Sequence, residues 1–336
     1  MRKILFYVSI FFLLTILLSA CNVNKKASIT KHPMTLRFAE NHVSGYPTSL
    51  ADEEFARLVE EKTEGRVKIE VITGGALTET SGETLEALKL GDIAFSRISI
   101  SPIAESVPRF NALMLPYLYR SSSHMWNVLN GKIGQDLLDD VERSGLEIMA
   151  LCYYDAGARN FYSTKEINSL ADMKNLRIRV QNQMMVDMCE ALGAVGVTGI
   201  DMTAVRSNIE NGIIDAAENN WPTYQSTGDY TSAKYYVLDQ HNRIPELLIA
   251  SKKVLSKLDA NDVKIIKECA KIAQEYEIKK WKEMESSAEQ IVRSNGNRIL
   301  GLSPSAQAEF QKAMKGIYEK YGSKYRDIIR TIQATR

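Results

Sequence analysis

Short, mostly apolar segments recur along the first half of the chain, and in several of them apolar residues alternate with polar ones, as in half-buried strands. The segments interpreted as strands are residues 34–39, 67–71, 92–95 and 147–153. Between the first three of them, residues 50–64 and 83–90 carry apolar residues at helical spacing, and a glycine follows each segment. Strands that alternate with helices in this way predict crossover connections and a mostly parallel sheet.

The clearest alternation lies in the middle of the chain, where Leu176, Ile178 and Val180 are separated by Arg177 and Arg179. The apolar residues are expected to face a core. Because successive side chains of a strand point to opposite faces, both guanidinium groups should then leave by the other face.

Helices are expected near residues 184–192 and 204–211, and residues 213–215 are interpreted as a short strand after the second helix. Glu218 and Asn219 would then lie just beyond the carboxyl end of this strand. In open parallel sheets, ligands bind outside the carboxyl ends of the strands, so both side chains are placed where a ligand is expected.

Residues 259–294 contain no proline or glycine, and apolar residues recur in them at roughly helical spacing. About 34 helical residues would make a rod of roughly 50 Å, at about 1.5 Å per residue. The apolar positions drift and do not keep a strict heptad, which argues against a coiled-coil partner.

The N-terminal residues are interpreted as a targeting signal. Arg2 and Lys3 precede an apolar run from Ile4 to Leu18, which is shorter than the roughly 20 residues of a membrane-spanning helix. The sequence Leu-Ser-Ala-Cys that ends at Cys21 resembles a lipobox. That resemblance implies a signal peptide over residues 1–20, a lipid on Cys21 and a tether over residues 21–33. The alternatives are an ordinary signal peptide or an uncleaved anchor helix.

The composition excludes several classes of function. The chain has 42 Lys and Arg against 41 Asp and Glu, and removal of the leader takes away two of the basic residues, so the overall charge gives no electrostatic case for nucleic acid. Cysteine and histidine spacings typical of zinc sites are missing, as are the nucleophile-elbow and phosphate-loop motifs. The sequence therefore predicts no metal and no cofactor. Cys152, Cys189 and Cys269 are interpreted as small buried apolar residues.

The candidate chemistry lies in two arginines, Arg159 in Gly157-Ala158-Arg159 and Arg179 in the alternating segment. A guanidinium presents a rigid fork of donors that fits a carboxylate with two parallel hydrogen bonds, which a lysine cannot reproduce. Taken alone, either arginine also fits the role of a surface ion-pair partner.

These arginine segments, together with Ala217-Glu218-Asn219-Asn220-Trp221, resemble the solute-binding proteins of TRAP transporters. The stretch from Leu113 to Arg120 also resembles that family, although a packed turn under the first lobe is the favoured interpretation of it. The resemblance implies an α/β, two-lobed fold of the periplasmic-binding-protein type, with a cleft between the lobes and a long helix that spans both. Lobe I would comprise residues 34–156 and about 245–284, and lobe II residues 157–244 and about 285–336.

The resemblance also implies a site for a carboxylate. Arg179 matches the family's carboxylate clamp, and Arg159 matches a second arginine of members that bind acidic sugars. Asn219 matches an asparagine that donates to the same carboxylate, and Asn41 a polar contact from the other lobe.

Two positions depart from the sialic-acid-binding branch of the family. Arg97 stands where that branch has a glutamate, and Met202 where it has a stacking phenylalanine. Because an arginine can only donate hydrogen bonds, a carboxylate-plus-hydroxyl solute is favoured over sialic acid, and the members that bind hexuronates are the most similar. The other residues expected to contact the sugar are His42, Glu83, Tyr154, Glu218 and Trp221. For Tyr154 and Trp221, packing in a core is the alternative interpretation.

We therefore expect a monomeric, extracytoplasmic lipoprotein that captures a small carboxylate-bearing solute, with a hexuronate favoured, and delivers it to TRAP permease subunits in the membrane. Two alternatives remain. A secreted enzyme acting on acidic sugars would use two paired carboxylates, for which Asp215 and Glu218 are the candidates. A sensory module that presents its ligand to a receptor would show the same residues.

Overall fold

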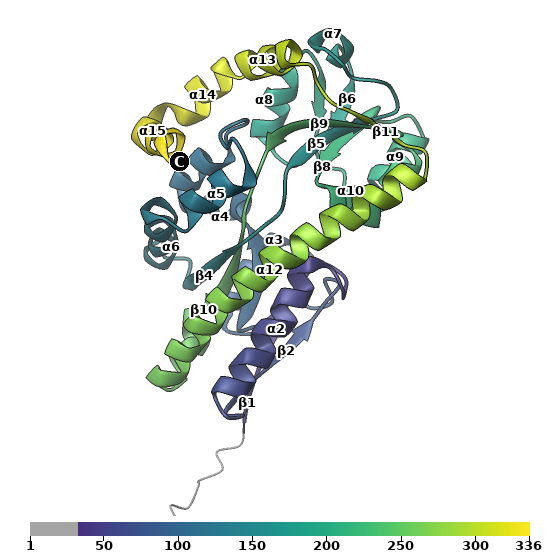
Figure 1. Ribbon diagram of the computed structural model, residues 1–336. Coiled ribbons are helices and arrows are strands. Elements are labelled where there is room, and N and C mark those ends of the chain that lie inside the picture. Colours follow the sequence, from purple (N-terminus) through teal and green to yellow (C-terminus); the bar gives the residue numbers. More distant parts are fainter. Residues whose placement is uncertain (1–32) are drawn as a thin grey trace, which may run out of the picture. The chain divides into compact units, whose positions relative to one another are not determined.

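The computed structural model describes residues 33–336, which build two β-sheets with helices around them (Figure 1). The expected signal peptide, Cys21 and nearly all of the expected tether lie outside the described residues. In the part of the chain that is described, no helix is long and apolar enough to cross a membrane.

Sheet A has five strands in the order β2-β1-β3-β10-β4. Their bounds are β1 Met34–Ala39, β2 Val67–Ile72, β3 Phe95–Ser99, β4 Ile148–Tyr154 and β10 Glu246–Ser251. Strands β1 and β3 are parallel, whereas β10 is antiparallel to both β3 and β4.

Sheet B has six strands in the order β11-β9-β5-β8-β6-β7. Their bounds are β5 Arg159–Ser163, β6 Arg177–Arg179, β7 Val195–Val197, β8 Ala216–Asn219, β9 Tyr235–Asn242 and β11 Arg298–Leu300. Strand β6 is parallel to β7 and β8, and β11 is parallel to β9, but β5 is antiparallel to both β8 and β9.

The expectation of a mostly parallel sheet is confirmed for strand direction: β10 alone runs against β1, β3 and β4 in sheet A, and β5 alone runs against the other strands of sheet B. These two strands are reversed because the chain passes directly between the two sheets twice. It leaves sheet A by β4 and enters sheet B by β5, and it returns from β9 to β10. The two crossings run in opposite directions, so β4 pairs antiparallel with β10 and β5 with β9. Whether the lobes divide at the residues expected from the sequence stays a prediction.

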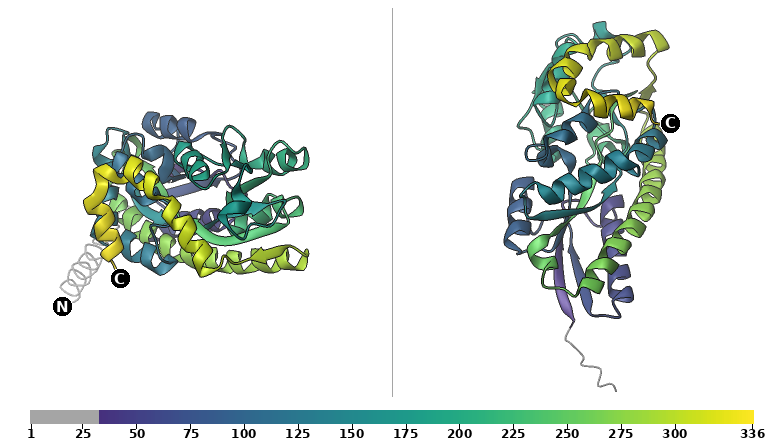
Figure 2. Two further views of the ribbon diagram at one scale, coloured as in Figure 1. Left: turned by 90° about the horizontal axis from the view of Figure 1, so that it is seen from above. Right: turned by 90° about the vertical axis from the view of Figure 1, so that its left-hand side faces the viewer.

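Helices surround both sheets (Figures 1 and 2). The α-helices are α2 Pro47–Lys62, α3 Ser81–Leu90, α4 Ile100–Ile103, α5 Ser122–Leu129, α6 Lys132–Arg143, α7 Leu170–Met173, α8 Gln183–Ala191, α9 Val205–Glu210, α10 Trp221–Ser226, α11 Lys252–Leu255, α12 Ala260–Ser294, α13 Pro304–Ala313, α14 Lys315–Gly322 and α15 Arg326–Ala334. The 3₁₀ turns are η1 Pro108–Met114, η2 Met202–Ala204, η3 Asp229–Thr231 and η4 Ser323–Tyr325.

Helix α12 joins the cores of the two lobes. Its side chains Ile266 and Ala270 are buried with Phe55 of α2 in the core against sheet A. Farther along the same helix, Ala288 and Val292 are buried in the core against sheet B. The predicted long helix that spans both lobes is confirmed.

The C-terminal helices reach back to the sheet A lobe. His124 of α5 lies 2.8 Å through Nε2 from the carbonyl oxygen of Ile332 in α15. Arg120 donates through Nη1 to the carbonyl oxygen of Gln333, also at 2.8 Å. The end of the chain, expected in lobe II, therefore contacts a helix expected in lobe I.

Candidate functional site

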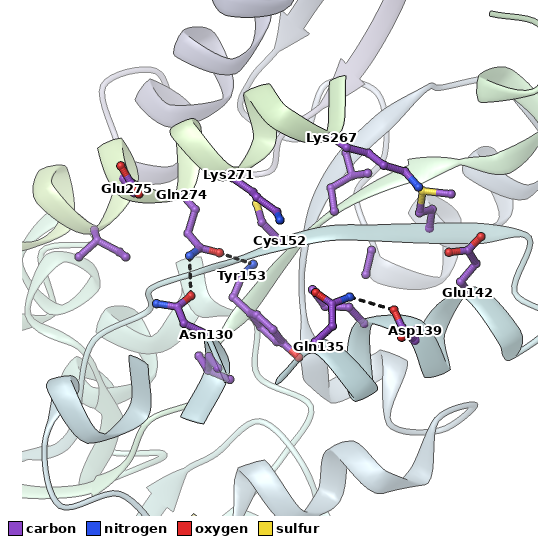
Figure 3. Close-up of a pocket in the computed structure, with 16 residues that line it drawn as sticks. Asn130, Gln135, Asp139, Glu142, Cys152, Tyr153, Lys267, Lys271, Gln274 and Glu275 are labelled. Carbon is purple, nitrogen blue, oxygen red and sulfur yellow. Dashed lines mark hydrogen bonds between the residues drawn. The ribbon is translucent and has the colours of Figure 1, made fainter. Parts of the chain in front are cut away.

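A cavity of about 80 Å³ lies between the ends of strands from the two sheets. Its walls include His42, Tyr46 and Glu246 from the sheet A lobe, and Arg159, Met202 and Asn219 from the sheet B lobe. A larger groove of about 430 Å³ lies elsewhere, between α6, β4 and α12, and contains none of the residues expected to bind a solute (Figure 3). The chemistry therefore favours the smaller cavity.

Arg159 begins β5 and is held rigidly by the neighbouring strand β8. It donates through Nη2 to Glu218 Oε1 at 2.9 Å and to the Glu218 carbonyl oxygen at 3.0 Å. Its Nη1 donates to Asn219 Oδ1 at 3.1 Å. Asn219 Oδ1 also accepts from the Asn220 amide, which leaves the Asn219 side-chain NH₂ as a donor at the cavity wall.

The positive charge of Arg159 is balanced by a buried network that continues behind it. His241 lies between Glu218 Oε2, at 3.3 Å, and Asp239 Oδ2, at 2.9 Å. Burial raises the pKa of Glu218, but the opposing effect of Arg159 and His241 is larger and lowers this pKa to about 2. Burial lowers the pKa of His241, but Asp239 and Glu218 raise it to about 9. Arg159, Glu218 and His241 are therefore charged near neutral pH.

This network predicts a pH-dependent stability. The folded pKa of His241 lies above its ordinary value of 6.5, so the stabilisation is complete below pH 6.5 and is lost as the pH rises through about 9. We expect the urea midpoint of unfolding to fall over this range, and a His241→Gln variant to lack that part of the fall. Parallel pH profiles for the two proteins would contradict the assignment.

Arg179 ends β6 and is buried, with 8% of its surface exposed. Its Nε donates to the carbonyl oxygen of Ile200 at 2.9 Å. No carboxylate of the described residues lies within 4 Å of its guanidinium, and no acceptor among them engages its terminal nitrogens. Arg179 does not itself line the cavity as it stands, but Gln181, two residues farther along the chain, does.

The sheet A side of the cavity is arranged by Arg97, which lies within β3 and is buried. Its Nη2 donates to Glu40 Oε1 at 2.6 Å and its Nη1 to Glu246 Oε1 at 3.0 Å. Its Nη2 also lies 2.9 Å from His42 Nδ1. Arg97 was expected to contact the solute, but its donors are engaged by protein groups and it does not line the cavity. Arg97 instead positions Glu246 and His42, and both of these side chains line the cavity.

Glu246, the first residue of β10, contributes an acceptor that the sequence did not reveal. Its Oε1 is bound by Arg97, whereas its Oε2 is buried and has no hydrogen-bond partner among the described residues. A buried carboxylate oxygen without a donor is costly, so a solute hydroxyl at this point would be stabilised. Glu246 carries no motif, and only its pairing with a residue 149 positions away identifies it.

Tyr46 bridges the two lobes at the cavity. Its hydroxyl lies 3.2 Å from Thr223 Oγ1 of α10, and its ring stacks on His42 with centroids 4.0 Å apart. Trp281 of α12 meets the same ring edge-on, at 5.8 Å between centroids. Gly157 allows α12 to pass this close, because a Cβ on it would lie 2.6 Å from Trp281 Nε1. Tyr46, Thr223 and Trp281 line the cavity but were not among the predicted residues.

Residues 38–324 match the family described as "Bacterial extracellular solute-binding protein, family 7". The chain belongs to this family. A "Solute-binding protein" of Chromohalobacter salexigens is 31% identical to it over 282 residues, which cover 83% of this chain and 82% of the relative. The chain is a TRAP-type solute-binding protein rather than an enzyme, as the sequence predicted.

Solved TRAP solute-binding proteins share the fold over nearly their whole length. One from Pseudomonas putida F1, with bound D-glucuronate, is 31% identical and superposes with a TM-score of 0.85, over 90% of this chain and 98% of the other. One from a Bradyrhizobium species, in complex with D-galacturonate, is 35% identical, with a TM-score of 0.83, over 90% of this chain and 100% of the other.

Four of the residues expected at the site of this family 7 protein lie away from the cavity. Asn41 is exposed. Glu83 accepts from the amides of Glu79, at 2.9 Å, and Thr80, and so caps its own helix α3. Tyr154 is fully buried in the core under sheet A, and Trp221 stacks on Tyr236 at 3.9 Å in the core of the sheet B lobe. The geometry does not support a solute contact for these four side chains.

Glu218 is also removed from the cavity wall, because it is fully buried behind Arg159. Asp215 is bound by Arg177, through Oδ2 to Nε at 2.9 Å, and this contact lowers the pKa of Asp215. Both carboxylates of the rejected enzyme hypothesis are therefore neutralised by arginines, and neither is available as a proton donor near neutral pH.

Proposed function

We propose that this solute-binding protein captures a hexuronate, such as D-glucuronate or D-galacturonate, and delivers it to TRAP permease subunits. Arg179, with Arg159 and Asn219, would bind the carboxylate of the sugar. Glu246 would accept hydrogen bonds from the hydroxyls of the sugar, and His42 would donate hydrogen bonds to them. Support comes from family membership, from the ligands of the structural relatives, and from the distribution of charge in the cavity.

The observation that carries the proposal is the uncompensated charge of Arg179. Three arginines of the described chain are buried, namely Arg97, Arg159 and Arg179. Arg97 is paired with Glu40 and Glu246, and Arg159 with Glu218. A buried guanidinium without a carboxylate is unfavourable unless a partner neutralises it. A carboxylate from the solute would supply that partner and accept hydrogen bonds from both terminal nitrogens.

The opposite wall distinguishes sugar acids from dicarboxylates. Glu246 is an acceptor only, so it favours a hydroxyl donor and repels a second carboxylate. A hexuronate has one carboxylate and several hydroxyls. The carboxylate matches the donors on the sheet B side of the cavity, and the hydroxyls match the acceptor Glu246 on the sheet A side. Contacts from both lobes to one sugar would also favour the closed arrangement, since only a difference in affinity between two conformations shifts their populations.

Retention at the membrane surface would keep the chain close to the permease subunits. We propose that lipid on Cys21 retains it there, after removal of residues 1–20. Durable anchoring takes more than one acyl chain, as bacterial lipoprotein modification provides.

Calorimetric titration of the full-length chain tests the proposal. We expect D-glucuronate or D-galacturonate to bind, and succinate, which lacks hydroxyls and carries a second carboxylate, to bind at least about tenfold more weakly. Glu246→Gln should weaken hexuronate binding by about tenfold, because a charge-assisted hydrogen bond is lost.

Glu83→Gln is the matched control, since Glu83 only caps α3 and glutamine preserves that role. We expect the affinity of this variant to equal that of the unchanged protein. Tighter binding of succinate than of either hexuronate would rule out the proposed solute.

A further inference from the structure

Strand β4 forms one edge of sheet A, and a groove of about 430 Å³ runs along it (Figure 3). Five consecutive residues of β4, from Met149 to Tyr153, line this groove. Side chains alternate along a strand, so the side chains of one face could supply only every second residue. Lining by consecutive residues therefore indicates that the backbone edge itself faces the groove.

Helices α6 and α12 border the groove on opposite faces of the sheet. Ala150 and Tyr153 are buried on the face of α6, where Tyr153 donates its hydroxyl to the Gly134 carbonyl oxygen at 2.9 Å. Leu151 and Cys152 are both buried on the face of α12. The change of alternation at Leu151 coincides with a register shift between β4 and β10, and such bulges occur at functional sheet edges.

Gln274 of α12 already occupies part of this edge. Its Oε1 accepts from the Tyr153 backbone amide at 3.1 Å, and its Nε2 donates to Asn130 Oδ1 at 2.9 Å (Figure 3). The side-chain amide thus stands where the peptide group of a neighbouring strand would lie. It closes one end of the groove and leaves the edge from Met149 to Cys152 for pairing.

The α6 wall is acidic and the α12 wall is mainly basic. Lys267 and Lys271 line the α12 side, with Glu275 beside Gln274 at its closed end, and Asp139 and Glu142 line the α6 side. None of these five side chains forms an ion pair with another described residue, although Asp139 accepts a hydrogen bond from Gln135. A strand added to β4 would point alternate side chains toward α12 and α6.

We propose that this groove binds an extended segment of a partner protein, which adds to sheet A as a strand beside β4. The segment carries acidic residues at the positions that face Lys267 and Lys271, and basic residues at the alternate positions that face Asp139 and Glu142. Backbone hydrogen bonds supply the binding and the alternating charges select the sequence. Pairing with four residues of β4 corresponds to roughly 13 Å of extended chain.

A second copy of this chain does not match the pattern. The other edge of sheet A is β2, whose exposed side chains Lys68 and Glu70 lie on the same face, opposite the buried Val67 and Ile69. That strand would bring opposite charges to one wall of the groove and apolar residues to the other. The free edge of sheet A in a second copy is therefore not the occupant, and the alternating charges favour a segment of a different protein.

Fluorescence polarisation with the full-length chain tests the proposal. The probe is a fluorescein-labelled tetrapeptide of alternating glutamate and lysine, and its control has the same composition with both glutamates first. We expect the alternating probe to bind at least about tenfold more tightly than the control. Methylation of its alternate backbone nitrogens should abolish binding, because strand pairing needs those donors. Equal binding of the three peptides would overturn the proposal.

Variants of the protein separate the groove from the solute site. The double variant Lys267→Glu/Lys271→Glu should bind the alternating probe about tenfold more weakly, whereas Lys279→Glu, an exposed lysine of the same helix outside the groove, should not. Gln274→Ala should bind more tightly, since it frees the Tyr153 amide. Unchanged D-glucuronate binding would show, without use of the peptide probe, that the variants are folded.

Two further results would overturn the proposal. One is probe binding that survives the double charge reversal. The other is a dimer of the chain that the probe dissociates in sedimentation velocity, because the groove would then be an interface between two copies.

Discussion

Replacement of Arg179 by alanine is expected to weaken D-glucuronate binding by about a hundredfold or more. The two terminal nitrogens of this guanidinium are free of protein acceptors in the described structure, and each charge-assisted hydrogen bond to a carboxylate contributes about 1.5 to 3 kcal/mol. The loss would leave the solute's anion buried without its main partner. Calorimetry with increasing sugar concentration measures the change directly.

The same variant is expected to keep its fold. Because Arg179 is not paired with a carboxylate among the described residues, its removal leaves no buried acid uncompensated, and thermal unfolding should shift little. Arg179→Lys keeps the charge but loses the two-pronged geometry, so we expect intermediate affinity. Arg177→Ala, two residues earlier on β6, removes an arginine that pairs with Asp215 and should leave affinity unchanged. Undiminished binding in Arg179→Ala would mean that another group holds the carboxylate.

Glu218→Gln is expected to lose much of its stability, whereas Arg179→Ala is expected to keep its stability and lose affinity. Glu218 is fully buried and holds both Arg159 and His241. The substitution keeps the shape of the side chain but removes the carboxylate that Arg159 and His241 share, and only His241 keeps another carboxylate neighbour, Asp239. Removal of one partner of a buried ion pair destabilises proteins by about 3 to 5 kcal/mol. Urea unfolding at neutral pH provides the measurement.

Asp215→Asn is the matched control for that experiment. Its partner Arg177 has 42% of its side chain exposed, so the pair is screened by solvent and contributes only about 0 to 1 kcal/mol. Similar losses in the two variants would show that burial of the Glu218 network does not determine its contribution. Glucuronate affinity should also fall in Glu218→Gln, because Arg159 would lose the contacts that orient it.

The local pattern of the sequence predicted most elements closely. Residues 259–294 were expected to be one helix, and α12 spans Ala260–Ser294. Where the pattern is weak, the predicted bounds differ from the observed ones. A strand was expected over residues 213–215, whereas β8 spans Ala216–Asn219. Glu218 therefore lies within a strand, where its side chain turns inward to Arg159. A shift of a few residues decided whether this carboxylate faces the solute or the core.

The residues that the sequence missed at the cavity are those whose role depends on distant partners. Glu246 is held by Arg97, 149 positions away, and Tyr46 meets Thr223 across 177 positions. No local periodicity encodes such pairs. Conversely, Glu83 and Trp221 have side chains suited to a sugar site, but Glu83 caps helix α3 and Trp221 packs in an aromatic core.

The sequence by itself indicated the class of protein and supplied candidates for one side of the site. The family resemblance rests on local motifs, and the rigid fork is a property of any arginine, so Arg159, Arg179 and Asn219 could be proposed without coordinates. Only the tertiary structure decided that Arg97 faces Glu40 and Glu246, and that Glu246 supplies the opposing acceptor. The physical reason is that desolvation and charge pairing depend on which groups share a buried volume. Folding alone brings those groups together.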